Sequence, residues 1–238
     1  MKSKEMMNQP DPLRSVLSFV FLVVFVFFIV SSTEFAFRNL GLDQSAAFLL
    51  LTLAIFGSAV NIPLFKIRSE GILTYERVGL LWGSWELPIY RPPQTTEVFI
   101  NIGGALVPVL LSGTLLVLNP SLLVPVLVTI VPMTLITHKI AKIIPGLGIT
   151  IPMFLILFIG LGVSISVEAL YFLMGAPLSV IELAIVAYTS VTIGTLVGAD
   201  LLNLPKVDKM QSSKVSIGGA GIFDGVFLAG LLVLVFLI

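Results

Sequence analysis

Two aspartates near the C-terminal end of the sequence have the residue type and the surroundings for acid–base chemistry. Asp200 lies in the apolar segment GADLLNLP, and Asp224 lies 24 residues further along in GGAGIFDG. Two carboxyl groups held together at low dielectric cannot both ionise easily, so the pair can share one proton. One carboxylate can then activate water while the other protonates the attacked carbonyl group. The chemistry predicted for Asp200 and Asp224 is aspartic-type hydrolysis.

The composition places these residues in a membrane protein. Hydrophobic residues make up 57% of the 238 residues and charged residues 11%, against roughly 45–50% and 25% in soluble domains. This excludes a soluble globular domain, a disordered chain and a nucleic-acid-binding protein. The chain has no cysteine and one histidine, His138. Disulfides, iron–sulfur clusters, thiolate zinc sites and a cysteine nucleophile are therefore excluded, and we expect no metal and no cofactor.

Seven apolar segments are long enough to cross the hydrocarbon core, which takes about 20 residues in a helix. They cover approximately residues 15–33, 44–64, 98–118, 121–138, 151–174, 178–202 and 217–238. We therefore expect an all-α polytopic membrane helix bundle of about seven transmembrane helices, with residues 1–238 as one transmembrane domain. A loop at about 66–96 contains strand-like pieces at 72–75 and 86–90. It predicts a small hairpin on the membrane surface or, alternatively, a loop that gates a substrate or docks a partner.

The positions of lysine and arginine predict the orientation of the chain. Twelve of the thirteen lie before the first span or in the loops after the second, fourth and sixth spans, and only Arg38 lies on the other side. Cytoplasmic loops of membrane proteins carry the excess of these residues. We expect a multi-pass protein of the cell (plasma) membrane with a cytoplasmic N-terminus, a cytoplasmic loop at 66–96 and an external C-terminus.

The last two predicted spans would bring the two aspartates together near the cytoplasmic side. The spans are antiparallel and joined by a short basic loop, so they must lie side by side. The sixth span carries the pair Gly194-xxx-Gly198 and the seventh the pair Gly221-xxx-Gly225, small-xxx-small pairs that permit close helix approach. In regular helices the two aspartates would differ in depth. The pair therefore requires that the sixth span continue past Leu204, or that residues 218–221 depart from a helix.

Two stretches of the sequence also resemble known families. SIGGAGIFDGVFL, which begins at Ser216, is preceded by GADLLNLP and accompanied by NIGGALVP from Asn101. Together these motifs resemble a family of uncharacterised prokaryotic integral membrane proteins, and that family implies no established activity. More distantly, one aspartate on the sixth span and one on the seventh resemble the GxGD intramembrane aspartyl proteases of the presenilin and prepilin peptidase types.

The protease resemblance implies catalytic roles for Asp200 and Asp224. The residues that we expect to support the pair are Gly198, Gly218, Gly219, Gly221, Gly225 and Asn101. The sequence departs from the protease pattern, because Gly221 precedes Asp224 by three residues, whereas in the motif the glycine comes one residue before the aspartate. The tyrosine before the first aspartate and the Pro-Ala-Leu of a ninth span also have no counterpart.

A proton-coupled transporter or an ion pathway is a second interpretation. Ionisable residues inside spans are costly and by default mark function. A line of carboxyl and hydroxyl groups would cross the bilayer. It is formed by Glu168 and Glu182 near the outer side, by Thr189 and Thr192, and by the two aspartates. Each glutamate also has a structural interpretation. Glu182 fits a capping box with Ser179, and Glu168 fits a hydrogen bond to Ser164 on the same helix face.

A non-catalytic membrane assembly protein is the third interpretation, in which the charged residues make packing contacts. The partners expected across the three interpretations are membrane lipid and either a transmembrane peptide substrate or a small ion, with no nucleic acid. The sequence leaves the oligomeric state open.

Overall fold

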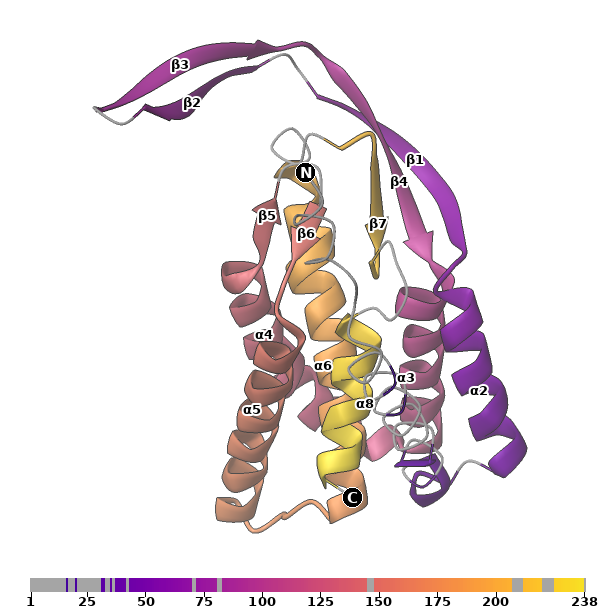
Figure 1. The fold of residues 1–238 in the computed structure, drawn as a ribbon. Coiled ribbons are helices and arrows are strands. Elements are labelled where there is room, and N and C mark those ends of the chain that lie inside the picture. Colours follow the sequence, from indigo (N-terminus) through magenta and orange to yellow (C-terminus); the bar gives the residue numbers. More distant parts are fainter. Residues whose placement is uncertain are drawn as a thin grey trace.

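The computed structural model of the protein describes residues 16, 20, 31–32, 35, 37–41, 43–69, 72–80, 83–144, 148–206, 212–219 and 225–237. Most of these residues are helical, and the helices form one bundle with strands at one end (Figure 1). The α-helices are α2 (Gln44–Gly57), α3 (Val107–Leu118), α4 (Leu123–Ile140), α5 (Met153–Leu173), α6 (Val180–Thr195) and α8 (Gly225–Leu237). Short π- and 3-10 segments are η2 (Ile102–Leu106), η3 (Pro120–Leu122), η4 (Leu196–Asp200) and η5 (Leu201–Lys206).

The helical membrane character that the sequence predicts is supported by three long apolar helices. Among the described residues, Pro120–Ile140, Met153–Leu173 and Val180–Lys206 are long and apolar enough to cross a membrane, while Gln44–Gly57 and Ile102–Leu118 are apolar but shorter. Most of the first predicted span, 15–33, lies outside the described residues. The helix bundle is therefore found, and its long members correspond to the fourth, fifth and sixth predicted spans.

The all-α expectation misses seven strands in the described part of the chain, and these shorten three of the predicted spans. The strands are β1 (Asn61–Ser69), β2 (Ile72–Leu80), β3 (Gly83–Arg91), β4 (Gln94–Asn101), β5 (Lys142–Ile144), β6 (Gly148–Thr150) and β7 (Lys214–Ile217). The second span was expected to reach residue 64, but α2 ends at Gly57. The third was expected to begin at residue 98, which lies in β4, and the seventh at residue 217, which ends β7. Short apolar runs fit a strand as well as a helix. Here hydrogen-bonded pairing with a neighbouring strand makes these residues strands.

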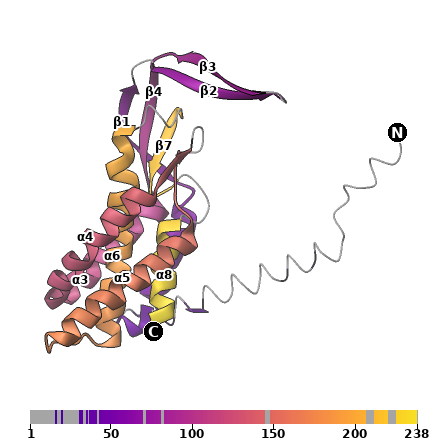
Figure 2. The same ribbon diagram turned by 90° about the vertical axis from the view of Figure 1, so that its left-hand side faces the viewer.

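The predicted hairpin exists and is longer than its two strand-like pieces. β1 pairs antiparallel with β4 from Asn61↔Asn101 to Ser69↔Gln94, and β2 pairs antiparallel with β3. Figures 1 and 2 show the β2–β3 ribbon reaching beyond the strand end of the bundle. Because β4 leads directly into η2 and α3, the hairpin is joined to the bundle by continuous backbone.

A third strand attaches the C-terminal part of the chain to this hairpin. β7 pairs parallel with β4, from Glu97↔Lys214 to Ile100↔Ile217, and gives the strand order β1–β4–β7. One face of this sheet packs on the helical segments, because Val98 and Ile217 form an apolar cluster with Ala105 of η2 and Leu196 of η4. The sheet therefore positions both π-helical segments.

Helix α6 lies at the centre of the bundle, and glycines bring its neighbours close. A Cβ atom built on Gly194 would lie 2.6 Å from Met133 Cβ, and one on Gly198 would lie 2.3 Å from the Thr134 carbonyl oxygen. The close approach predicted for the Gly194-xxx-Gly198 pair is thus real, but its partner is α4. Helix α8 approaches α6 through Gly230, where a Cβ would lie 2.8 Å from Thr192 Oγ1.

Candidate functional site

Asp200 ends η4, and its carboxylate contacts the second sequence motif. Asp200 is half-buried, and its Oδ2 accepts a hydrogen bond of 2.7 Å from the backbone N–H of Gly218. Gly218 follows β7 directly, so the segments GADLLNLP and SIGGAGIFDG meet at this contact.

The turn at Gly218 and Gly219 departs from a helix, as the aspartate pair requires. The two residues have φ angles of +80° and +88°, in the left-handed region that glycine adopts at little cost. A Cβ atom on Gly218 would lie 2.6 Å from Ala105 Cβ and 2.7 Å from Ala105 N. Only glycine fits here, because the turn lies directly against η2. The alternative condition is met as well, since η5 continues the sixth span past Leu204 to Lys206.

Two π-helical segments face this turn. η4 contains Gly198 and Asp200, and η2 contains Gly103 and Gly104. A π-turn closes its hydrogen bonds from residue i to i+5, and such turns are frequent at functional sites. In a regular α-helix Glu182 and Asp200, 18 residues or five whole turns apart, would share one face. The π-turn in η4 changes the angular position of Asp200 around the helix, so this shared face is not kept.

The departure of η4 and η5 from a regular α-helix leaves backbone carbonyl groups without their usual i to i+4 hydrogen bonds. Side-chain donors bind to these carbonyl groups. Asn203 Nδ2 donates to the carbonyl oxygens of Ala199 at 2.8 Å and Gly198 at 3.2 Å, and Lys206 Nζ donates to Asn203 Oδ1 at 2.7 Å. His138 Nδ1 lies 3.2 Å from the Gly198 oxygen, a hydrogen bond when Nδ1 carries the proton. Sequence reasoning missed His138 and Asn203 in this role; the available signal was a histidine and an asparagine at span ends.

Asn101 supports the site through the backbone and does not contact Asp200. Its side chain is fully buried. Nδ2 donates to the Ser58 carbonyl at 2.7 Å and to Asn61 Oδ1 at 3.1 Å, while Oδ1 accepts from Gly104 N at 2.7 Å. Asn101 thereby caps η2 and fixes β1 beside it. Asn61 and Ser216, which donates to Asn61 Oδ1 at 2.6 Å, complete a polar cluster that the sequence did not predict.

The two glutamates of the transport interpretation bind the connection between α5 and α6. The capping box predicted for Glu182 is confirmed, because Ser179 N donates to its Oε2 at 2.8 Å and Glu182 N donates to Ser179 Oγ. Glu168 Oε2 accepts from Leu178 N at 3.0 Å. The predicted Ser164–Glu168 hydrogen bond is wrong, and Ser164 Oγ is buried with no hydrogen-bond partner among the described residues.

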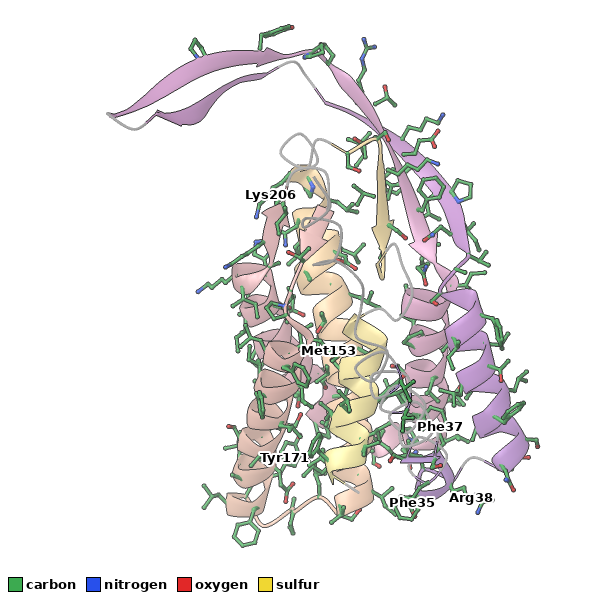
Figure 3. The ribbon with its side chains drawn as sticks, viewed as in Figure 1. Phe35, Phe37, Arg38, Met153, Tyr171 and Lys206 are labelled. Carbon is green, nitrogen blue, oxygen red and sulfur yellow. The ribbon has the colours of Figure 1, made fainter. Side chains whose placement is uncertain are left out.

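These glutamates lie far from Asp200 along the bundle. In Figure 3, Tyr171 marks the α5 end of the bundle where α5 and α6 connect, and Lys206 marks the opposite end, to which Asp200 belongs. Between the two ends, Thr189 and Thr192 are fully buried on α6. The hydroxyls of Thr189 and Thr195 have no hydrogen-bond partner in the part of the chain that the structure describes.

Asp224 and Gly221 lie outside the described residues. Gly225 begins α8. The separation of the Asp200 and Asp224 carboxyl groups therefore stays a prediction. Within the described ranges, no three side chains of His, Asp or Glu lie close enough together to hold a metal ion.

The three long apolar helices define the class as a helical membrane protein. These helices pack closely at glycines, and the Asp200 carboxylate lies where η4 meets the turn at Gly218. The chain belongs to the family DUF1614, described as a protein of unknown function, whose family model matches residues 55–236. The match includes Asn101, Asp200 and Asp224, so the motifs lie inside the family region. No curated protein and no solved structure matches the chain.

Proposed function

We propose that this protein is a membrane-embedded aspartyl hydrolase of the protease type, with Asp200 and Asp224 as its acid–base pair. The observation that carries the proposal is the hydrogen bond from Gly218 N to Asp200 Oδ2. It joins the two aspartate motifs, and Gly218 precedes Asp224 by only six residues. The proposal requires the two carboxyl groups to lie within about one bridging water molecule of each other.

In this mechanism the Gly218 N–H orients one oxygen of Asp200 and leaves the other to accept a proton from water. The water oxygen attacks the carbonyl carbon of a peptide bond, while the protonated carboxyl of Asp224 donates its proton to the carbonyl oxygen. The tetrahedral intermediate then collapses, the C–N bond breaks, and the amine nitrogen leaves with a proton from the pair. The proposed substrate is an unwound transmembrane peptide.

The proposed setting is a multi-pass protein of the plasma membrane, with seven spans, a cytoplasmic N-terminus and an external C-terminus. The shorter apolar helices α2 and Ile102–Leu118 would count among the spans. The positions of the charges support this orientation, because Lys206 and Arg38 lie at opposite ends of the bundle (Figure 3). The chain has no cysteine, so single cysteines introduced at Lys206 or Arg38 can be labelled from outside intact cells. Labelling at residue 206 and not at 38 would contradict the orientation.

The activity is tested with the full chain in lipid nanodiscs and a library of fluorogenic transmembrane peptides. Asp200→Asn and Asp224→Asn should each lower the cleavage rate about 100-fold or more, because general acid–base groups contribute on that scale. Asparagine keeps an oxygen that can accept the Gly218 hydrogen bond, so Asp200→Asn should still fold. Ser166→Ala, at an exposed hydroxyl on α5, is a control that should cleave normally. Full activity in either asparagine variant would reject the proposal.

A proton-coupled transporter or ion pathway is the second candidate, and the buried hydroxyls of α6 favour it. Thr189 and Thr195 lie on the helix that ends at Asp200, and their hydroxyls have no partner among the described residues. Vesicles holding a pH-sensitive dye would report proton movement. Thr189→Val and Asp200→Asn should both slow transport, whereas a hydrolase would tolerate Thr189→Val. If neither cleavage nor transport is found, a membrane assembly role stands.

A further inference from the structure

A pocket lies on the β1–β4–β7 sheet, on the face opposite the one that packs on the helical segments. It has a volume of about 410 Å³ and is lined by Ala59, Asn61, Phe99, Lys214, Val215 and Ser216. In β4 and β7, Phe99 and Ser216 are register partners and alternate with Val98 and Ile217, which pack toward η2 and η4. The pocket is thus separate from the Asp200 carboxylate, and its volume lies within the range of about 300–1,000 Å³ typical of small-ligand sites.

The orientation of the Asn61 amide in this pocket follows from a chain of hydrogen bonds. The Gly104 N–H can only donate, so the atom of Asn101 that it contacts at 2.7 Å must be Oδ1. The other amide atom of Asn101 is therefore Nδ2, a donor, and the atom of Asn61 that it contacts at 3.1 Å must be the acceptor Oδ1. Ser216 Oγ donates to the same Oδ1 at 2.6 Å.

The two N–H groups of Asn61 remain available as a result. A carbonyl oxygen has two lone pairs, and both on Asn61 Oδ1 are used by Asn101 and Ser216. Among the described residues, no hydrogen bond is formed by Asn61 Nδ2. Asn61 is half-exposed and lines the pocket. The pocket therefore holds an amide donor whose direction is fixed by its neighbours.

Lys214 adds a positive charge to the same pocket. Its Nζ lies 5.8 Å from the centre of the Phe99 ring, which holds it over the pocket lining by a cation–π contact. Its register partner Glu97 is bound elsewhere, since Lys66 Nζ lies 2.7 Å from Glu97 Oε1. In the described ranges, no carboxylate forms a salt bridge with Lys214. Glu97 lies close enough for the Lys214 charge to contribute to its lowered pKa, but its direct ion pair is with Lys66. An ammonium group without a direct ion pair among the described residues, together with fixed amide donors, selects an anion.

We propose that this pocket binds the phosphate group of a phosphate ester, through the Lys214 ammonium and the Asn61 amide N–H groups. The ester is either a membrane phospholipid or a soluble phosphate compound, which share this chemistry. The proposal does not depend on hydrolase or transport activity.

The test measures ligand binding to the full chain in neutral-lipid nanodiscs and in detergent. Phosphatidic acid binding is counted by native mass spectrometry, and glycerol 3-phosphate binding is followed by calorimetry. Lys214→Gln removes the charge from an exposed side chain. Asn61→Asp keeps the oxygen that accepts from Ser216 and Asn101 but replaces the donor by a negatively charged oxygen. Each variant should weaken binding roughly 10- to 100-fold, as expected for charge-assisted hydrogen bonds.

Arg68→Gln is the matched control, because Arg68 is an exposed basic residue of the same sheet that does not line the pocket. It should bind as the unaltered protein does. Binding of phosphatidic acid alone would identify a lipid headgroup site, and binding of both compounds would identify a general phosphate ester site. Absence of binding by either compound would overturn the proposal. So would equal losses in Arg68→Gln and Lys214→Gln, because these would indicate attraction by net charge only.

Discussion

Replacing Gly218 by alanine tests whether the turn after β7 must touch η2. Alanine at a φ of +80° costs about 1–2 kcal/mol, because its Cβ crowds the following carbonyl oxygen. The new Cβ would also lie 2.7 Å from the backbone nitrogen of Ala105. A backbone atom cannot move aside as a flexible side chain can, and overpacking of this kind costs about 1–3 kcal/mol. Gly218→Ala should therefore destabilise the protein by about 2–5 kcal/mol.

The assay is reversible unfolding in mixed micelles with increasing SDS, followed by circular dichroism. Gly113→Ala and Gly162→Ala are matched controls, because a Cβ built on either glycine meets nothing within 4 Å. Both lie inside helices, so alanine should leave the stability unchanged or raise it by up to about 1 kcal/mol. A Gly218→Ala variant within about 0.5 kcal/mol of the unaltered protein, the usual range of harmless surface changes, would refute the reasoning.

Three further perturbations test other parts of the structure. Asn101→Ala leaves the buried Gly104 N–H without its acceptor and should cost about 2 kcal/mol or more in the same unfolding assay; an unchanged midpoint would show that water replaces the side chain. Ser179→Ala removes the cap of α6 and should cost about 1 kcal/mol, whereas Ser179→Asp should restore it. Lys66 holds the pKa of the Glu97 carboxyl below its ordinary value by hydrogen bonding and charge. Their pair therefore stabilises the fold above that ordinary pKa, and the stabilisation is lost as the pH falls through the lowered value. Lys66→Gln should flatten the acid side of the stability curve at low salt, and an identical curve would contradict the pairing.

The sequence predicted those parts of the site that depend on local chemistry. The capping box at Ser179 and Glu182 follows from residue types at fixed spacing, and the departure of Gly218 from a helix follows from a run of glycines. The contact between the motif of Asp200 and that of Gly218 follows from a short loop between neighbouring elements. Each of these conclusions needs only residues close together in the chain.

The rest depends on partners distant in the chain. The apolar run after Asn61 fits a membrane helix by composition, and only its pairing with β4 makes it a strand. The Gly194-xxx-Gly198 pair predicts close packing but does not say which helix packs there, and α4 takes the position. The π-turn at Leu196–Asp200 likewise arises where α4, the sheet and α6 meet, and hydropathy carries no signal for it.

The parallel pairing of β7 with β4 has a consequence for biosynthesis. Thr96 Oγ1 donates to the Ser212 carbonyl across 116 residues of sequence, and Ser216 bonds Asn61 across 155. Such distant pairings close late, because the chain between them must first be in place. The hairpin β1–β4 can form soon after its synthesis, but its third strand is translated only after α6. Until then η2 lacks Gly218 against it and Asp200 lacks its donor, so these contacts can form only after β7 and Gly218 have been translated.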